Sequence, residues 1–181
     1  MKLVLIDRDG VINDELPNYV KSVEELIVYD AALEGIALLT RQGFTPVVIT
    51  NQSVVGRGII TMETLNRIHG HMGEKVGERG GRIEEVFACT DHPDRATYRR
   101  KPAPGMLIEA MRKYDATPES TPFIGDAITD MEAAMAAKCP RYLVMTGKGQ
   151  RTLATLPDAV KPVTTCADLL DAAHKIVKMY G

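Results

Sequence analysis

Two carboxylates stand two residues apart near the start of the chain. They belong to the string Asp7-Arg8-Asp9-Gly10, which directly follows a short apolar run at residues 2–6. In an extended chain the side chains of residues i and i+2 lie on the same side, so Asp7 and Asp9 face the same way. Two like charges this close repel unless a divalent cation neutralises them or one carboxyl stays protonated. The pair therefore indicates acid–base chemistry, metal binding or both.

A third carboxylate follows another apolar run, in the string Phe123-Ile124-Gly125-Asp126. Asp126 is the candidate for a third oxygen ligand. Mg²⁺ binds a few carboxylates, several waters and substrate phosphate, which matches this set of groups. Strings of this kind are also typical of simple Asp-Gly turns. Because each aspartate follows a predicted strand, the metal-site interpretation is favoured.

Two further segments carry groups that bind phosphate. The string Thr50-Asn51-Gln52-Ser53 offers a hydroxyl, amide donors and backbone N–H groups. Lys101 lies in Arg99-Arg100-Lys101-Pro102, inside a basic loop that also contains Arg95. A lysine acts as a point charge on a phosphoryl group, and an arginine can bind a second anion. The alternatives are a capping or turn role for the first segment and a solvated loop for the second.

Several other sequence features carry no functional prediction. Gly147-Lys148 is followed by Gly149 and lacks the upstream glycine of a P-loop, and no GxGxxG string occurs. His69 and His71 are two residues apart on a predicted helix and cannot face the same way. We therefore interpret both histidines as surface or core positions with satisfied hydrogen bonds.

The elements that must position these groups alternate along the chain. Apolar runs predict strands at residues 2–6, 45–50, 85–89, 121–124 and 141–145, and helical periodicity marks residues 31–42, 61–76, 105–114, 130–137 and 168–179. Alternation of this kind predicts a doubly wound, parallel α/β sheet with helices on both faces. Ligands of such sheets bind outside the carboxyl ends of the strands, where the polar groups cluster.

Composition limits the classes of protein. The 181 residues are 45% hydrophobic and 25% charged, which predicts a single globular domain over residues 1–181. The net charge of -2 argues against nucleic acid or membrane partners. The apolar run at residues 3–6 is too short for a signal peptide or a membrane span, so we expect a cytoplasmic protein, monomeric by default. The three cysteines form no CxxC pair and predict neither disulfides nor a zinc ribbon.

The ordered set of motifs resembles the haloacid dehalogenase superfamily. The set comprises Asp7-Arg8-Asp9-Gly10, Thr50-Asn51, Lys101-Pro102 and Gly125-Asp126 with Asp130 four residues on. Three longer strings are similar to the branch that contains heptose bisphosphate and histidinol-phosphate phosphatases. They are residues 7–13, residues 51–58 with Gly56-Arg57-Gly58, and residues 100–106. The resemblance covers roughly residues 2–149 and implies a Rossmann-like fold.

The resemblance implies catalytic roles for residues at the matching positions. Asp7 would be the nucleophile that forms an aspartyl-phosphate, and Asp9 would protonate the leaving oxygen and then activate water. Mg²⁺ would be bound by Asp7, the main-chain carbonyl of Asp9 and Asp126. Thr50 and Lys101 would stabilise the charge of the transferring phosphoryl group.

It also implies how substrate is recognised. The substrate would be contacted by Asn51, Gln52 and Ser53, and Lys101 would bind the substrate's phosphoryl group. Arg100 would recognise the sugar or a distal phosphate. Asp130 would orient Lys101 or the metal shell, and the loop around Asn18 and Tyr19 would line the entrance. The intervals before residue 31 and between residues 50 and 101 are too short for a cap domain, so we expect an open site.

One loop departs from the pattern of zinc-bearing relatives. Those relatives carry Cys-x-His and then Cys-x-Cys before Arg-Lys-Pro, whereas this chain has Cys89, Asp91, Thr97 and Arg99 at these positions. One ligand of four cannot make a tetrahedral zinc site, and His92 does not restore the pattern. We therefore expect no structural zinc.

The resulting functional prediction is a Mg²⁺-dependent phosphomonoesterase that acts on a small sugar bisphosphate. The expected reaction is removal of the 7-phosphate from a heptose 1,7-bisphosphate. A histidinol-phosphate phosphatase is the nearest alternative, and the basic loop with Arg100 favours the bisphosphate. A polynucleotide 3′-phosphatase is less consistent with 5% aromatic residues and no net positive charge. A catalytically silent binding module is the alternative from another class, and the complete set of aspartates and lysine argues against it.

Overall fold

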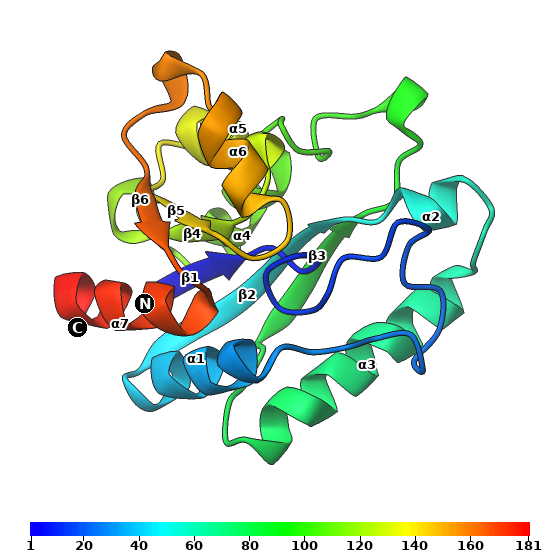
Figure 1. The fold of residues 1–181 in the computed structure, drawn as a ribbon, viewed down its shortest axis with the longest axis horizontal. Helices are drawn as coiled ribbons and strands as arrows, with labels where there is room; N and C mark the ends of the chain where they lie inside the picture. The colour runs from blue at the N-terminus through cyan, green and yellow to red at the C-terminus, as the bar shows by residue number, and fades with distance from the viewer.

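The computed structural model describes residues 1–181 and contains one six-stranded sheet. Its strands are β1 (Lys2–Ile6), β2 (Phe44–Asn51), β3 (Glu85–Cys89), β4 (Phe123–Gly125), β5 (Arg141–Val144) and β6 (Thr164–Cys166). Every neighbouring pair is parallel, in the order β3-β2-β1-β4-β5-β6 (Figure 1). The strand order reverses between β1 and β4, so the crevice at their carboxyl ends is the topological switch point.

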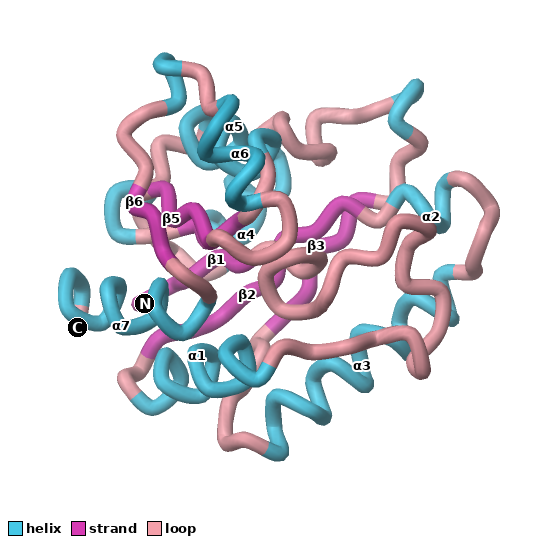
Figure 2. The backbone as a smooth tube through the Cα atoms, in the orientation of Figure 1, coloured by secondary structure: helices cyan, strands magenta, loops and turns pink.

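Helices connect the strands and cover both faces of the sheet (Figures 1 and 2). They are α1 (Asp30–Arg41), α2 (Ser53–Gly56), α3 (Met62–Glu78), α4 (Gly105–Lys113), α5 (Ile128–Ala136), α6 (Gly149–Thr155) and α7 (Leu169–Tyr180), with 3₁₀ turns at Pro93–Arg95, Pro118–Ser120 and Asp158–Val160. None of these helices combines the length and the apolar character needed to cross a bilayer.

Alternate side chains of β1 build the core on opposite faces of the sheet. Val4 and Ile6 belong to an apolar cluster that also contains buried residues of α1, α3 and α7. Leu3 and Leu5 belong to a second cluster with buried residues of α4 and α5. Because successive strand residues point to opposite faces, a strand buried on both sides must be apolar throughout. This requirement explains the continuous apolar run that precedes Asp7.

The predicted fold class is confirmed, and the five predicted strands all occur with bounds that differ by at most a few residues. The sequence analysis did not predict β6, whose residues are Thr-Thr-Cys. It also did not predict α2 or α6, which are too short to show helical periodicity.

No separate cap domain covers the sheet. The segment between β1 and α1 contains isolated bridges, from Asn13 to Asp9 and to Val28, in place of regular elements. The segment between β2 and β3 contains α2 and α3, and Ile68 and Met72 of α3 are part of the sheet's own core. The absence of a cap was predicted from the lengths of these two segments.

Candidate active site

A cavity of 590 Å³ lies at the carboxyl ends of the central strands. Its walls come from residues at or directly after the carboxyl ends of β1, β2 and β4, together with the loops before α1, α4 and α6. The lining includes every site residue predicted from the sequence: Asp7, Asp9, Thr50, Asn51, Gln52, Ser53, Arg100, Lys101 and Asp126. The fold therefore brings together four segments that are far apart in the chain, as the switch-point rule predicts.

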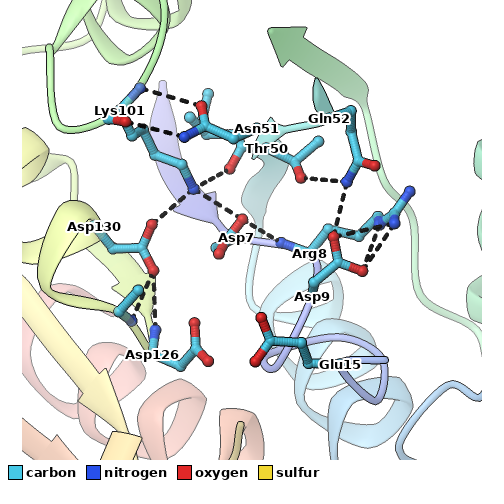
Figure 3. Close-up of polar contacts among 12 residues, drawn as sticks. Asp7, Arg8, Asp9, Glu15, Thr50, Asn51, Gln52, Lys101, Asp126 and Asp130 are labelled. Carbon is cyan, nitrogen blue, oxygen red and sulfur yellow. Dashed lines mark hydrogen bonds and ion pairs between the residues drawn. The ribbon is translucent and has the colours of Figure 1, made fainter. Parts of the chain in front are cut away.

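Lys101 lines this cavity, and its ammonium group lies between two carboxylates (Figure 3). Its side chain is 3% exposed, and Nζ lies 2.8 Å from Asp7 Oδ1 and 2.7 Å from Asp130 Oδ1. Nζ also donates to the carbonyl oxygen of Ile49 at 3.0 Å. Burial opposes the charged form, but Asp130 and Asp7 outweigh it and raise the pKa of Lys101. The lysine is therefore a fixed positive charge beside Asp7.

Two side chains hold Lys101 in place. Asn51 accepts a hydrogen bond from the Lys101 backbone N–H at 3.1 Å and donates to the Lys101 carbonyl at 3.0 Å. Asp130 accepts from the backbone N–H groups of Asp126 and Ala127 at 3.1 and 3.0 Å, which fixes the carboxylate that pairs with Lys101. The predicted contact of Asp130 with Lys101 is thus present. Asn51 was predicted to contact substrate. In the structure its side chain instead hydrogen-bonds to the Lys101 backbone and so positions the lysine.

Three buried carboxylates crowd the same site. One carboxylate oxygen from each of Asp7, Asp126 and Asp130 lies within 4.8 Å of the others. Burial and the charge of Asp130 raise the pKa of Asp7 well above its usual range, although Lys101 opposes the shift. The same two causes raise the pKa of Asp126 to about 7. One lysine does not neutralise this cluster, so the site fits a divalent cation.

The position of Asp126 depends on two glycines. Gly10 and Gly147 have φ values of +81° and +53°, and a Cβ atom at either position would overlap the Asp126 carboxylate. Asp126 Oδ2 accepts from the Lys148 backbone N–H at 2.7 Å. Gly147-Lys148 thus forms a turn that contacts the carboxylate cluster. The sequence analysis showed only that this string is not a P-loop and assigned it no role.

The Asp9 carboxylate is surrounded by donors and not by the other carboxylates. Oδ1 accepts from Arg8 Nη2 at 2.8 Å and from Asn13 Nδ2 at 3.0 Å, and Oδ2 accepts from Gln52 Nε2 at 2.8 Å. Burial raises the pKa of Asp9, but the charge of Arg8 and these hydrogen bonds lower it by more, so the net pKa lies below its ordinary value. The resting site therefore contains an ionised Asp9 that can accept a proton.

Gln52 links Asp9 to Thr50. The second N–H of its amide donates to Thr50 Oγ1 at 2.9 Å (Figure 3). Because the hydroxyl oxygen of Thr50 accepts this bond, its own hydrogen is free to donate to a ligand in the cavity. Gln52 was predicted to contact substrate. Its observed contacts orient the side chains on either side of it.

The cavity also contains residues that the sequence analysis did not assign to the site. Glu15 pairs with Lys148 at 2.5 Å beside the carboxylate cluster, and Arg57 lines the wall formed after α2. Arg8, Lys101 and Lys148 each pair with a carboxylate in the cavity, whereas Arg57 and Arg100 form no ion pair. Tyr19 lines the cavity as predicted, and Asn18 does not. The two unpaired guanidinium groups can bind an anion.

His69 of α3 contacts the Arg8 side chain but does not line the cavity. Its Nε2 atom lies 3.1 Å from Arg8 Nη1, although 61 residues separate the two in the chain. Burial and the charge of Arg8 lower the pKa of His69 to about 4. His69 was interpreted as a surface or core position with satisfied hydrogen bonds, and it is half-buried and contacts Arg8. A histidine that contacts a buried arginine leaves no signal in the local sequence.

The lowered pKa of His69 predicts a pH dependence of stability. Below about pH 6.5, His69 of the unfolded state binds a proton, whereas His69 of the folded state becomes protonated only when the pH falls to about 4. Stability is therefore unaffected above pH 6.5 and lost as the pH falls through this window. We expect the wild type to lose about 2 kcal/mol more than His69→Gln between pH 7 and pH 5. Urea unfolding of both proteins at the two pH values measures this difference, and equal losses would contradict it.

Hydrogen bonds order the loop after β3 at the positions where zinc-bearing relatives carry metal ligands. Asp91 Oδ2 accepts from the backbone N–H of Thr97 at 2.7 Å and from its hydroxyl at 2.6 Å. Arg99 pairs with Glu109 of α4 at 3.0 Å. The buried Cys89 thiol has a raised pKa because of burial. Asp91 and Thr97 thus connect the two ends of the loop directly.

A doubly wound parallel sheet with a buried Asp-Lys-Asp cluster at its switch point is the arrangement of a phosphoryl-transfer enzyme. A family model described as HAD-hydrolase-like matches residues 98–172 of the chain. The chain is 39% identical to the D-glycero-beta-D-manno-heptose-1,7-bisphosphate 7-phosphatase of Bordetella bronchiseptica over 180 residues, 98% of this chain and 99% of that protein. The protein of the same name from Neisseria meningitidis is 37% identical over 173 residues, 93% of this chain and 92% of that protein. The chain belongs to the haloacid dehalogenase superfamily of phosphatases.

Solved structures give the same relationship. The crystal structure of D,D-heptose 1,7-bisphosphate phosphatase from B. bronchiseptica, complexed with magnesium and phosphate, superposes with a TM-score of 0.93 at 39% identity and covers 99% of both chains. The enzyme of that name from Burkholderia thailandensis superposes with a TM-score of 0.76 at 34% identity, covering 98% of this chain and 99% of that one.

Proposed function

We propose that this phosphatase removes the 7-phosphate of D-glycero-D-manno-heptose 1,7-bisphosphate through an aspartyl-phosphate on Asp7. The observation that carries the proposal is the placement of Lys101 2.8 Å from Asp7 Oδ1, in the cavity that Asp9 and Thr50 also line. A nucleophile, a phosphate-binding cation, a hydroxyl donor and a proton-transfer group thus face one space. Relatives that match this chain over nearly its full length carry the name of this activity.

The carboxylate cluster supports a Mg²⁺ requirement. Asp7, Asp126 and the main-chain carbonyl of Asp9 are the groups that would bind the ion, because Asp130 already accepts two backbone N–H groups and contacts Lys101. When bound, the ion neutralises phosphoryl oxygens and lowers the repulsion between them and Asp7.

In the first step, a carboxylate oxygen of Asp7 attacks phosphorus and the bond from phosphorus to the sugar oxygen breaks. Asp9 gives its proton to that oxygen, which leaves as the sugar hydroxyl. The resting Asp9 is ionised, because Arg8 and its hydrogen bonds lower its pKa. An approaching phosphate dianion raises the pKa of a neighbouring carboxyl, so substrate binding favours the protonated form that this step needs.

In the second step, Asp9 takes a proton from a water molecule, whose oxygen attacks the phosphorus of the aspartyl-phosphate. The bond between phosphorus and Asp7 breaks and releases phosphate, which regenerates the carboxylate. Lys101 and the free O–H of Thr50 stabilise the negative charge on the phosphoryl oxygens in both steps. Their positions are fixed before substrate arrives, through Asn51 and Gln52.

Arg57 and Arg100 support the choice of a bisphosphate. They line the cavity without carboxylate partners, so they are available for the phosphate that is not transferred. A neutral sugar or an amino-imidazole group would leave both guanidinium groups without an anion. Arg100 also donates to the Asp91 carbonyl at 3.4 Å, which holds it on the ordered loop.

Phosphate release from a panel of substrates tests the proposal. We expect heptose 1,7-bisphosphate to have a far higher kcat/KM than histidinol phosphate or a 3′-phosphorylated oligonucleotide, and we expect a chelator to abolish turnover. Preference for either of the other two substrates would keep the chemistry and replace the proposed substrate. Hydrolysis that persists in excess chelator would contradict the role of Mg²⁺.

Arg100→Ala separates recognition from chemistry. We expect the variant to lose ~10- to 100-fold in kcat/KM for the bisphosphate, because a charge-assisted hydrogen bond to phosphate contributes roughly 1.5–3 kcal/mol. A simple monoester should lose less than about threefold. Arg112→Ala is a matched control, since Arg112 is exposed on α4 and does not line the cavity. Equal losses on both substrates would remove the role of Arg100 in binding the second phosphate.

A further inference from the structure

Arg8 is a buried arginine whose donors need partners. Its side chain is 1% exposed. Nε and Nη2 donate to the Asp9 carboxylate, at 3.2 Å and 2.8 Å to Oδ1. A buried charge that lacks hydrogen-bond partners is costly, so the remaining terminal nitrogen, Nη1, also requires an acceptor.

His69 supplies that acceptor. Its Nε2 atom lies 3.1 Å from Arg8 Nη1. An arginine has donors and no acceptor, so Nε2 must present its lone pair, and the imidazole is neutral with its proton on Nδ1. No other side chain is hydrogen-bonded to Nη1. The rotation of the guanidinium plane is therefore fixed by Asp9 at one edge and by His69 at the other.

We propose that His69 is a positioning residue for phosphoryl transfer, because it fixes Arg8 and through Arg8 the carboxylate of Asp9. The inference rests on the proposed role of Asp9 as the group that protonates the leaving oxygen. His69 does not touch the cavity, whose lining includes Arg8 and Asp9 but not His69. It acts from the far side of the arginine.

The contact between His69 and Arg8 should affect the rate of phosphoryl transfer, because it constrains the orientation of the Arg8 guanidinium group. Arg8 and Asp9 are adjacent in the chain, so the guanidinium reaches the carboxylate only in a narrow range of side-chain rotations. If Nη1 lost its acceptor, the guanidinium would turn toward water and its hydrogen bonds to the Asp9 carboxylate would weaken. A misplaced proton donor lowers the rate of bond cleavage without changing the groups that bind phosphate. His69 should therefore affect kcat and leave KM nearly unchanged.

Leaving-group dependence tests this role. The value of kcat/KM reports the steps up to phosphoryl transfer to Asp7, and a sugar oxygen needs a proton to leave whereas 4-nitrophenolate does not. The substrates are 4-nitrophenyl phosphate and the best alkyl or sugar phosphate of the panel above. The variants are His69→Leu, which removes the acceptor, and His69→Gln, whose amide oxygen can replace Nε2. His71→Leu is the matched control, because His71 lies on the same helix and pairs with Glu74 at 3.5 Å.

We expect His69→Leu to lose roughly tenfold in kcat and in kcat/KM for the sugar phosphate, with KM within about twofold, and to lose less than about twofold in kcat/KM for 4-nitrophenyl phosphate. His69→Gln should recover most of the loss, and His71→Leu should match the wild type. Equal losses of His69→Leu on both substrates would indicate a general structural defect and overturn the inference. Wild-type rates in His69→Leu would also overturn it while leaving the proposed function intact. A wild type that hydrolyses no phosphate ester would overturn both.

Discussion

Asp7→Asn is expected to lose at least about a thousandfold in phosphate release, because an amide does not form the acyl phosphate on which both steps depend. The fold should survive the change. Asn retains an oxygen that can accept the Arg8 backbone N–H, which donates to Asp7 Oδ1 at 2.7 Å. Phosphate release by the two proteins at equal concentration measures the loss.

Stability should change in the opposite direction to activity. Burial and Asp130 raise the pKa of Asp7 in the folded state, so an ionised Asp7 costs stability at neutral pH. Removing that charge is therefore expected to leave the melting temperature unchanged or to raise it, which is a stability–activity trade-off.

Intact-mass spectrometry adds a direct readout to this prediction. Wild-type protein quenched during turnover should carry one phosphoryl group that Asp7→Asn lacks. A folded Asp7→Asn variant with wild-type turnover would show that another group is the nucleophile. Loss of activity together with loss of the folded state would instead show that Asp7 is required for folding.

The sequence predicts the parts of this fold that one local pattern defines. β1 and β2 are buried on both faces over most of their length, so each contains a continuous apolar run, and each run ends where a polar residue enters the cavity, at Asp7 and Thr50. β6 gives no such signal, because two of its three residues are exposed. A strand is therefore visible in the sequence where several consecutive residues are apolar, as in β1 to β3, rather than wherever a strand forms.

The site follows the same logic. Every residue that the motifs predicted at the strand ends lines the cavity, and the motifs named Asp130 as a partner of Lys101. They did not separate residues that contact ligand from residues that orient them. Asn51 and Gln52 carry side chains that suit phosphate, yet their observed partners are Lys101, Asp9 and Thr50. Such roles depend on contacts between segments that are distant in the chain.

The contact of His69 with Arg8 and the pair of Glu15 with Lys148 were missed for that reason. Each joins two loops or elements that only the tertiary fold brings together. A histidine or a glutamate has many uses, so its type alone predicts little. The aspartates were found because their regular position after strands restricts what they can do.

Lys101→Met should damage both activity and stability. The variant keeps the length of the side chain and removes the charge that faces Asp7 and Asp130 at 2.8 and 2.7 Å. Removing one partner from a buried ion pair costs about 3–5 kcal/mol, because the other charges stay buried. Loss of a preorganised cation beside the phosphoryl group should lower kcat by roughly 100- to 1000-fold.

The stability loss should depend on pH with a definite sign. Without the lysine, the folded-state pKa of Asp7 rises further, because the charge that favoured its ionised form is gone. A carboxyl whose folded pKa is raised costs stability above that pKa and less below it. The free-energy gap between wild type and Lys101→Met, measured by urea unfolding, should therefore narrow as the pH falls from 8 to 6.

Lys113→Met is the matched control for this variant. Lys113 is exposed on α4 and pairs with Glu85 at 2.8 Å, and an exposed pair contributes at most about 1 kcal/mol. The control should retain wild-type turnover and nearly wild-type stability at every pH. If Lys101→Met behaved like the control, the ammonium group would be neither the phosphate-binding cation nor the partner that keeps Asp7 and Asp130 together. If it lost stability but kept its kcat, Lys101 would serve the fold alone, and phosphoryl charge would have to be stabilised by other groups of the cavity.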